Sequence, residues 1–154
     1  MPGFTSSLKT EWLPDGKTWK VIETFRFYSG DYGSGLFVEV PEGTITDLAS
    51  IPKLVRWLIP KVGKDAQGAV CHDVMYRTGC MSIQRANSLT GSVSNEAVPI
   101  SRGMADSMYH QAMIALGVST ARRKAIYYGL IVGGWVAWNN HRNRNPGTGT
   151  ATTQ

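Results

Sequence analysis

Acidic side chains are missing from the last third of the chain. Residues 107–154 contain no aspartate or glutamate but five basic residues, whereas residues 1–106 contain 11 residues of each sign. The formal net charge of +5 therefore lies in the last third. This asymmetry indicates an anionic neighbour, which could be nucleic acid, a phospholipid surface or an acidic protein patch. Solubility charge flanking an apolar helix is an equally good interpretation. The basic residues are Arg122, Arg123, Lys124, Arg142 and Arg144.

Cysteine is also scarce, with only Cys71 and Cys80 in the sequence. Two cysteines exclude a dense disulfide framework, and their spacing fits neither a metal knuckle nor a redox pair, so we expect free thiols in a reducing compartment. The longest uncharged, mostly apolar stretch, 125–138, is shorter than the roughly 20 residues of a membrane-spanning helix. No basic region leads into an apolar run at the N-terminus. We therefore expect neither a signal peptide nor a membrane span.

The first half of the sequence has the pattern of β-structure. A Pro-Asp-Gly turn within 13–19 predicts a hairpin. Imperfect alternation of apolar residues predicts a half-buried strand over 19–29, and a further strand over 35–41 is closed by a proline. After this strand, Ser50 and Pro52 are suitable to start a short helix before Pro60.

The second half has helical spacing. We expect one helix over 65–77 ended by Gly79, and another over 103–117 that packs through its apolar positions and is stopped by Gly117. A third begins at a Ser119 or Thr120 cap and continues to Arg142. The polar stretch 81–101 is predicted to be a long loop. The apolar positions in the second helix are Met104, Met108, Ala112 and Ile114.

These elements predict an α+β fold in which an N-terminal antiparallel hairpin or small sheet precedes a three-helix C-terminal half. We expect a single domain over 1–145, with its β part at about 4–45 and its helical part at about 53–141. Residues 146–154 have the composition of a flexible tail.

The last helix is open to two interpretations. It can be a buried helix in which Gly133 and Gly134 let a neighbouring element approach closely. It can also be an interfacial helix, because Trp135 and Trp138 with flanking arginines suit a membrane surface or a partner groove.

The stretch GAVCHDVMYRTG places His72, Asp73 and Tyr76 on one predicted helix. Residues four apart share a helix face, so His72 and Tyr76 are neighbours, and Asp106 on the next helix is the natural carboxylate for both. His72 could then act as a general base, with Tyr76 and Asp106 orienting it. Asp73 and Asp47 could hold a hard cation such as Ca²⁺. The alternatives are an ordinary polar core for the histidine and a helix cap for Asp47.

Three stretches together resemble the phage and prophage family DUF1353: VPEGTITDLASIPKLVRWLIP, GAVCHDVMYRTG and ADSMYHQAMIALGV. The resemblance covers roughly residues 4–138, and the block 46–52 is its most specific part. It implies a tailed-phage origin, manufacture in the bacterial cytoplasm and a place in the virion, among other phage structural proteins in a multi-subunit assembly. It implies no particular activity.

A second resemblance is to the phospholipase A2 superfamily, which carries His-Asp-x-x-Tyr on one helix and a supporting aspartate on its antiparallel partner. It implies His72 as the base, Asp73 as a calcium ligand, and Tyr76 and Asp106 as support. The glycines of YGSG (32–35) are similar to that family's calcium loop.

Three functions are compatible with these patterns. The first is a structural or accessory component of a phage particle, in the tail or elsewhere in the virion. The second is a hydrolase of envelope esters or amides, acting on phospholipid or the cell wall with His72 as base. The third, which has no recognised binding motif behind it, is nucleic-acid binding through the basic C-terminal third.

Overall fold

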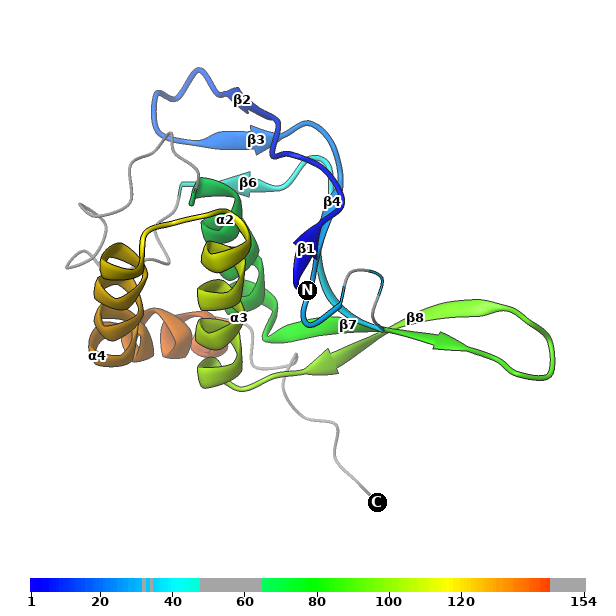
Figure 1. Cartoon of the computed structure of the whole chain (residues 1–154). Helices are drawn as coiled ribbons and strands as arrows, with labels where there is room; N and C mark the ends of the chain where they lie inside the picture. The colour runs from blue at the N-terminus through cyan, green and yellow to red at the C-terminus, as the bar shows by residue number, and fades with distance from the viewer. Residues whose placement is uncertain (32, 34, 48–64, 145–154) are drawn as a thin grey trace.

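The computed structural model describes residues 1–31, 33, 35–47 and 65–144. Two antiparallel sheets and three helices occupy these ranges (Figure 1), which confirms the α+β class with its N-terminal sheet and helical C-terminal half. The predicted short helix before Pro60 and the predicted flexible tail lie outside the described residues. Element labels follow Figure 1.

The smaller sheet contains three short strands in the order β2–β3–β6. Strands β2 (Thr10–Trp12) and β3 (Trp19–Val21) form the hairpin predicted from the Pro-Asp-Gly turn, and β6 (Ile45–Thr46) pairs with β3. The Asp15 carboxylate accepts the backbone N–H groups of Lys17 and Thr18 at 2.9 and 3.0 Å. This Asx turn fixes the hairpin register.

The predicted single strand over 19–29 is wrong, because the chain leaves one sheet and enters the other within it. Strand β3 ends at Val21, and β4 (Phe25–Tyr28) belongs to the larger sheet. The alternation continues through Val21, Glu23 and Phe25, but Glu23 is an acid at what would be an inward position. It faces out and pairs with Lys9 at 2.5 Å. The chain bends where this charge must reach water.

The larger sheet has the strand order β1–β4–β5–β7–β8, with every pair antiparallel. Its outermost strand on one side is β1 (Gly3–Phe4), and β5 (Leu36–Val40) confirms the strand predicted there. One face is apolar and packs into the core with the helices, whereas the other carries the Arg26–Glu39 ion pair at 2.6 Å. The core side chains of the apolar face include Phe25, Phe27, Val38 and Val40.

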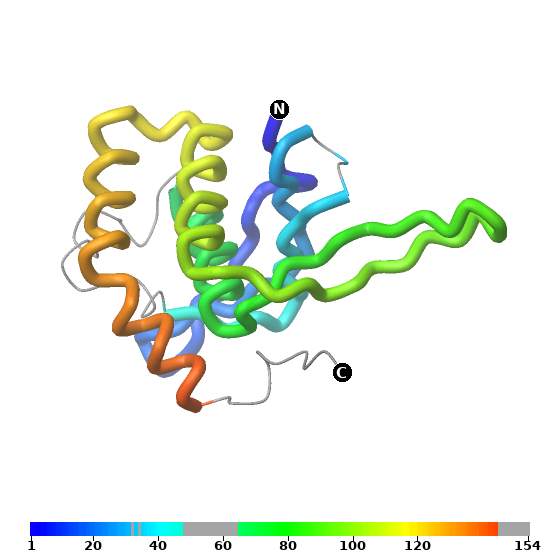
Figure 2. The backbone as a smooth tube through the Cα atoms, turned by 90° about the horizontal axis from the view of Figure 1, so that it is seen from below, coloured from blue at the N-terminus to red at the C-terminus, as the bar shows by residue number. Residues whose placement is uncertain are grey.

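The predicted loop over 81–101 is wrong, since these residues form a long β-hairpin. Strands β7 (Cys80–Ala86) and β8 (Val93–Pro99) pair over their whole length and project from the body of the protein (Figures 1 and 2). Towards the tip both faces are exposed, so polar residues occupy both and no apolar alternation marks the strands. Residues 80–99 are called the arm below.

Three helices complete the fold and confirm the helical prediction. They are α2 (Ala66–Thr78), α3 (Arg102–Ala115) and α4 (Thr120–Arg144). Helix α2 ends at Gly79, which has the left-handed φ of 66° expected at this position. The Ser101 hydroxyl caps α3 by accepting the Met104 N–H at 3.2 Å. The two cysteines are free thiols, as predicted.

The buried stripe of α3 is displaced from its predicted position. Met108 and Ala112 are buried as expected, but Met104 and Ile114 are 41% and 49% exposed. A spacing of four residues drifts around a helix that turns every 3.6 residues. The stripe actually follows pairs of adjacent positions, namely Ala105, Asp106, Met108, Tyr109, Ala112 and Met113.

Helix α4 buries one face and exposes an apolar opposite face. Gly134 and Leu130 lie in the buried face, so the predicted close approach at a glycine is correct there. The helix changes direction along its length, between the gold and orange parts in Figures 1 and 2, and a glycine pair is a common cause of such bends. No helix among the described residues is long and apolar enough to cross a membrane. The exposed apolar residues are Tyr128, Ile131, Val132, Trp135 and Val136.

Candidate functional site

Helices α2 and α3 approach closely beside the residues of the His-Asp-x-x-Tyr pattern. A Cβ atom at Gly68 would lie 3.1 Å from the ring of Tyr109 and 3.2 Å from the Ala112 Cβ. Only a glycine lets the two backbones come this near without displacing the tyrosine. His72 and Tyr76, one and two turns further along α2, therefore point into the interface with α3.

The Asp106 carboxylate on α3 is the acceptor at the centre of this interface. Its Oδ1 lies 2.9 Å from the His72 Nε2 and accepts the Tyr76 hydroxyl at 2.6 Å. These distances confirm the predicted contact of Asp106 with both side chains. A carboxylate accepts but does not donate, so the Nε2 of His72 carries the proton in this pair.

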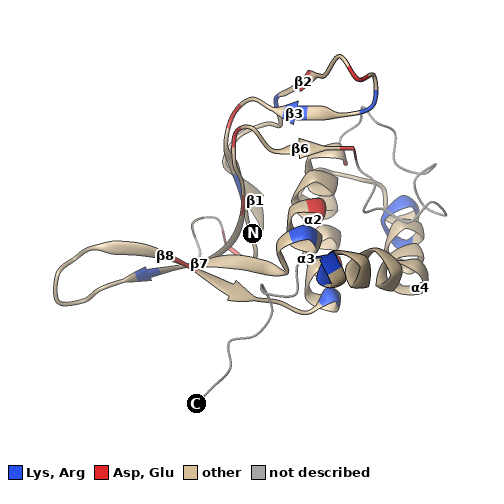
Figure 3. Cartoon of the chain, turned by 180° about the vertical axis from the view of Figure 1, so that it is seen from behind, with Lys and Arg blue, Asp and Glu red and all other residues tan. Residues whose placement is uncertain are grey.

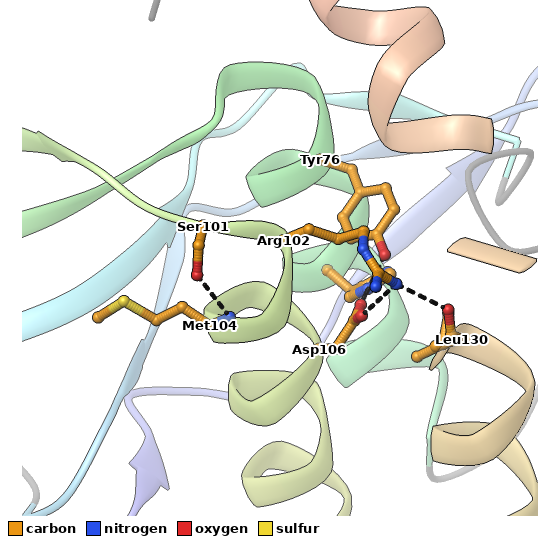
Figure 4. Close-up of polar contacts among 7 residues, drawn as sticks. Tyr76, Ser101, Arg102, Met104, Asp106 and Leu130 are labelled. Atoms are coloured by element: carbon orange, nitrogen blue, oxygen red, sulfur yellow. Dashed lines mark hydrogen bonds and ion pairs between the residues drawn. The ribbon is translucent and has the colours of Figure 1, made fainter. Parts of the chain in front are cut away.

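Arg102 joins the same carboxylate to a third helix. Its Nη1 donates to the Asp106 Oδ2 at 3.2 Å and to the backbone carbonyl of Leu130 on α4 at 3.0 Å. Figure 4 shows the guanidinium between the carboxylate and that carbonyl. The resulting cluster of His72, Tyr76, Arg102 and Asp106, called the Asp106 network below, links α2, α3 and α4.

Burial and aromatic packing surround the histidine. The His72 ring is fully buried and stacks at centroid distances of 4.0 Å from Tyr76 and 5.0 Å from Tyr109. Its Nδ1 is buried, and no group in the described part of the chain forms a hydrogen bond with it. Desolvation, reinforced by the Asp106 carboxylate, raises the pKa of the Tyr76 hydroxyl above its ordinary value, which keeps Tyr76 a donor.

The Asp106 network has the elements of a general base but lacks access to a substrate. His72 and Tyr76 are 0% exposed and Asp106 is 2% exposed. A general base must lie within hydrogen-bond reach of the proton that it removes. In this conformation the network ties helices together, which corresponds to the polar-core alternative for the histidine.

The two predicted metal ligands do not join this network into a cation site. Asp73 is buried and binds the Thr46 hydroxyl and the Arg77 guanidinium, both at 2.8 Å, whereas Asp47 is exposed. Within the ranges 1–31, 33, 35–47 and 65–144, no group of three or more His, Cys, Asp and Glu side chains could hold a metal ion. Two residues of the YGSG stretch, at 32 and 34, lie outside the described ranges.

Three of the five basic residues predicted to meet an anionic partner are engaged within the chain. Arg122 pairs with the buried Asp65 at 2.9 Å, and Arg123 donates to the Val118 carbonyl at 2.6 Å. Arg142 donates to the Tyr76 and Arg77 carbonyls in the last turn of α2. Lys124 and Arg144 are exposed, so an anionic partner would be met mainly by these two.

Several residues that shape this site were not predicted from the sequence. Arg102 precedes Asp106 by four residues, a helical ion-pair spacing that could have been noticed. Asp65 and Arg122 are 57 residues apart, and only the fold brings them together. Tyr109 packs against Gly68 and the His72 ring. From the sequence alone, it could be predicted as a core residue but not as a neighbour of His72.

Comparison with known proteins identifies the family. Residues 19–130 match the model of a family described as a protein of unknown function, DUF1353. This match spans more than half of the chain, and the protein therefore belongs to the DUF1353 family. No curated protein and no solved structure matches the chain. The phospholipase A2 resemblance receives no support from these comparisons.

Proposed function

We propose that this protein is a structural or accessory component of a tailed-phage particle, held in place by neighbouring subunits. The observation that carries the proposal is the arm, which projects from the domain without a core of its own (Figure 2). The phage setting comes from the resemblance of the 46–52 block and its neighbours to phage-encoded chains.

The arm has the properties of a surface that is completed by other molecules. Its link to the rest of the sheet is short: among the described residues, β5 pairs with β7 at Ile83 and Ser82, and the Gln84 N–H donates to the Gly35 carbonyl. Beyond these residues β7 and β8 pair with each other, and a two-stranded hairpin is only marginally stable in water. At its tip Leu89 is 93% exposed, and nearby Val93 is 58% exposed. Apolar side chains so far from the core favour a protein contact at the tip.

The Asp106 network supports a scaffold role as well. Its buried Asp106 carboxylate binds His72 and Tyr76 of α2 and Arg102 of α3, and Arg102 also donates to the Leu130 carbonyl of α4. Hydrogen bonds shared among three helices favour one arrangement of these helices. A rigid helical body beneath a projecting arm suits a subunit whose task is to hold geometry in an assembly.

Purified virions of a phage that encodes this chain test the proposal. Quantitative mass spectrometry should find the protein at a fixed ratio to the major structural proteins. Leu89→Asp should lower its incorporation, whereas Ser88→Asp, at the neighbouring exposed position, should not. Absence of the protein from virions would refute the structural role, and equal incorporation of both variants would refute the tip contact alone.

A hydrolase of envelope esters or amides is the second candidate, and the 2.9 Å His72–Asp106 pair favours it. The complete burial of His72 counts against it. The test is release of product from phospholipid vesicles or purified cell walls, with and without Ca²⁺. His72→Ala should abolish the activity and His110→Ala should preserve it, both in folded protein. Equal activity in the two variants would end this candidate.

A further inference from the structure

Strand β8 is the last strand on one side of the larger sheet in the described part of the chain, and its backbone pattern shows which groups point outward. The Asn87 N–H donates to the Ser92 carbonyl, and the Ile100 N–H donates to the Gly79 carbonyl, each at 2.8 Å. Both pairs continue the β7–β8 register, so the even-numbered residues of β8 bond to β7. The backbone groups of the odd-numbered residues therefore point away from β7, and these residues are Val93, Asn95, Ala97 and Pro99.

This edge lacks most of the features that usually protect an edge strand. Natural edge strands carry lysine, proline or a bulge, which prevents pairing with another strand. The β7–β8 register is continuous over seven pairs, and Pro99 lies only at the base. The arm has two charged residues, Arg85 and Glu96, which neutralise each other at 2.7 Å (Figure 3). A regular and neutral edge of this kind is a template for another strand.

The outward backbone groups of β8 are complementary to those of a second copy of the same strand. At the base, Pro99 has no N–H to donate, and at the tip the Gly91 N–H is already bonded within the turn. The outward positions that remain are centred on Asn95. Two antiparallel copies use all of them when Asn95 lies opposite Asn95 and Val93 lies opposite Ala97. This register has a two-fold axis at Asn95, as a symmetric dimer requires.

The side chains that this register brings together are also compatible. An amide carries both donors and an acceptor, so Asn95 on the axis can bond to the same residue of the second copy. Val93 meets Ala97, which makes an apolar pair. Glu96, the charged residue of β8, lies opposite Ser94, so like charges do not face each other directly. This complementarity of the strand with itself favours a second copy of the chain as its partner.

The same register gives the exposed tip of the arm a protein surface to meet. Continued along the chain, it brings Leu89 level with Ser101 of the second copy, at the start of α3. Leu89 is 93% exposed, and Met104 in the first turn of α3 is 41% exposed. Figure 4 shows the Met104 side chain pointing away from Asp106. Each apolar tip would therefore reach the body of the other molecule near an exposed apolar side chain.

We propose that two copies of this protein pair through β8, which joins their larger sheets into one continuous antiparallel sheet. The Asn95–Asn95 and Val93–Ala97 pairs each exchange both N–H···O bonds. The outer part of the arm then contains β7 and β8 of both copies, which exceeds the three strands that a sheet needs for independent stability. This inference rests on the assembly role proposed for the arm, and it names a second copy as the partner.

Sedimentation of the purified full chain tests the pairing, and a dimer that depends on protein concentration is expected. Asn95→Lys places two ammonium groups side by side on the axis and should weaken the dimer by roughly ten-fold or more. Asn139→Lys is the matched control, because it adds the same charge at an exposed position of α4 and should leave the association unchanged. Circular dichroism should show that both variants are folded, since both asparagines are exposed.

A disulfide cross-link tests the register. Opposite residues of a hydrogen-bonded antiparallel pair have Cα atoms about 5.5 Å apart, which a disulfide can span. With the partly exposed thiol of Cys80 removed by Cys80→Ser, Asn95→Cys should give a covalent dimer on mild oxidation. Val93→Cys is the control and should not, because the two Val93 positions are offset by about 13 Å along the strands.

Each of three outcomes would overturn the proposal. A protein that stays monomeric at every concentration would leave β8 to a strand of a different protein. A dimer that Asn95→Lys does not weaken would be held by another surface, such as the apolar face of α4. Equal cross-linking of Val93→Cys and Asn95→Cys would exclude the two-fold register. None of these outcomes bears on the presence of the protein in virions, so the pairing and the assembly role fail separately.

Discussion

The His72 Nε2 and the Asp106 Oδ1 are 2.9 Å apart in a place that solvent does not reach. The same carboxylate also binds Tyr76 and Arg102, which makes it the common acceptor for donors from two helices. We therefore expect the Asp106 carboxylate to contribute mainly to the stability of the fold.

Asp106→Ala should lower the free energy of unfolding by about 3–5 kcal/mol, because three donors, one of them charged, lose their buried acceptor. Urea unfolding followed by circular dichroism measures this loss. Glu42→Ala removes an exposed carboxylate and should change the same quantity by less than about 0.5 kcal/mol. Equal unfolding midpoints for the two variants would show that the Asp106 network does not support the fold.

Gly134→Ala should destabilise the protein by about 1–3 kcal/mol, the usual range for overpacking. The new Cβ would lie 2.6 Å from the Tyr76 hydroxyl oxygen and 3.3 Å from the Arg102 Nη1. Gly103→Ala is the matched control on α3, because nothing lies within 4 Å of its Cβ. This control should be neutral or stabilising by roughly 0.5–1 kcal/mol. In thermal unfolding, the midpoint temperature of Gly134→Ala should therefore fall, whereas that of Gly103→Ala should stay the same or rise.

Gly79→Ala should be more destabilising than Gly117→Ala, although the two glycines have similar positive φ angles of 66° and 68°, respectively. The positive φ costs each variant about 1 kcal/mol. At Gly79 the Cβ would also collide with the Arg142 guanidinium, whereas nothing lies within 4 Å at Gly117. In an Arg142→Ala background the difference between the two variants should shrink, and a double-mutant cycle measures this. An unchanged difference would mean that the collision has no energetic effect.

Alkaline pH should destabilise the protein through Tyr76 and Tyr109. Burial raises the pKa of both phenols above the ordinary value in the folded state, with the Asp106 and Asp65 carboxylates adding to the shift. The stability that depends on their protonation is complete below about pH 10 and falls as the pH rises further. Tyrosinate absorbance should show that Tyr76 and Tyr109 ionise only on unfolding. Tyr76→Phe and Tyr109→Phe should each remove one of these two late ionisations, and an unchanged absorbance step at unfolding in both variants would contradict the prediction.

Local sequence signals were reliable where the structure depends on local chemistry. Gly79 and the Pro-Asp-Gly turn mark element ends because they favour particular backbone angles, and both predictions are confirmed. The contact of His72 and Tyr76 with Asp106 also follows from helical spacing once the two helices are taken as neighbours.

Other features depend on tertiary position, which the sequence does not show. The arm has no apolar alternation because most of it has no core to face, so its sequence predicts a loop. The burial of His72 depends on Gly68, which lets α3 approach and brings the Tyr109 ring against the imidazole. Residues 19–29 are divided between two sheets, and the only sign of this in the sequence is Glu23, an acidic residue at an otherwise apolar position of the alternation.

Gly79 gives the arm a mechanical connection to the rest of the protein. This residue ends α2, its carbonyl holds the strand that returns from the arm, and the guanidinium of Arg142 rests against it. A force applied at the tip of the arm would enter the helical body at this point and be shared between the last turn of α2 and the last turns of α4. The base of the arm is therefore anchored to two helices as well as to β5 of the sheet.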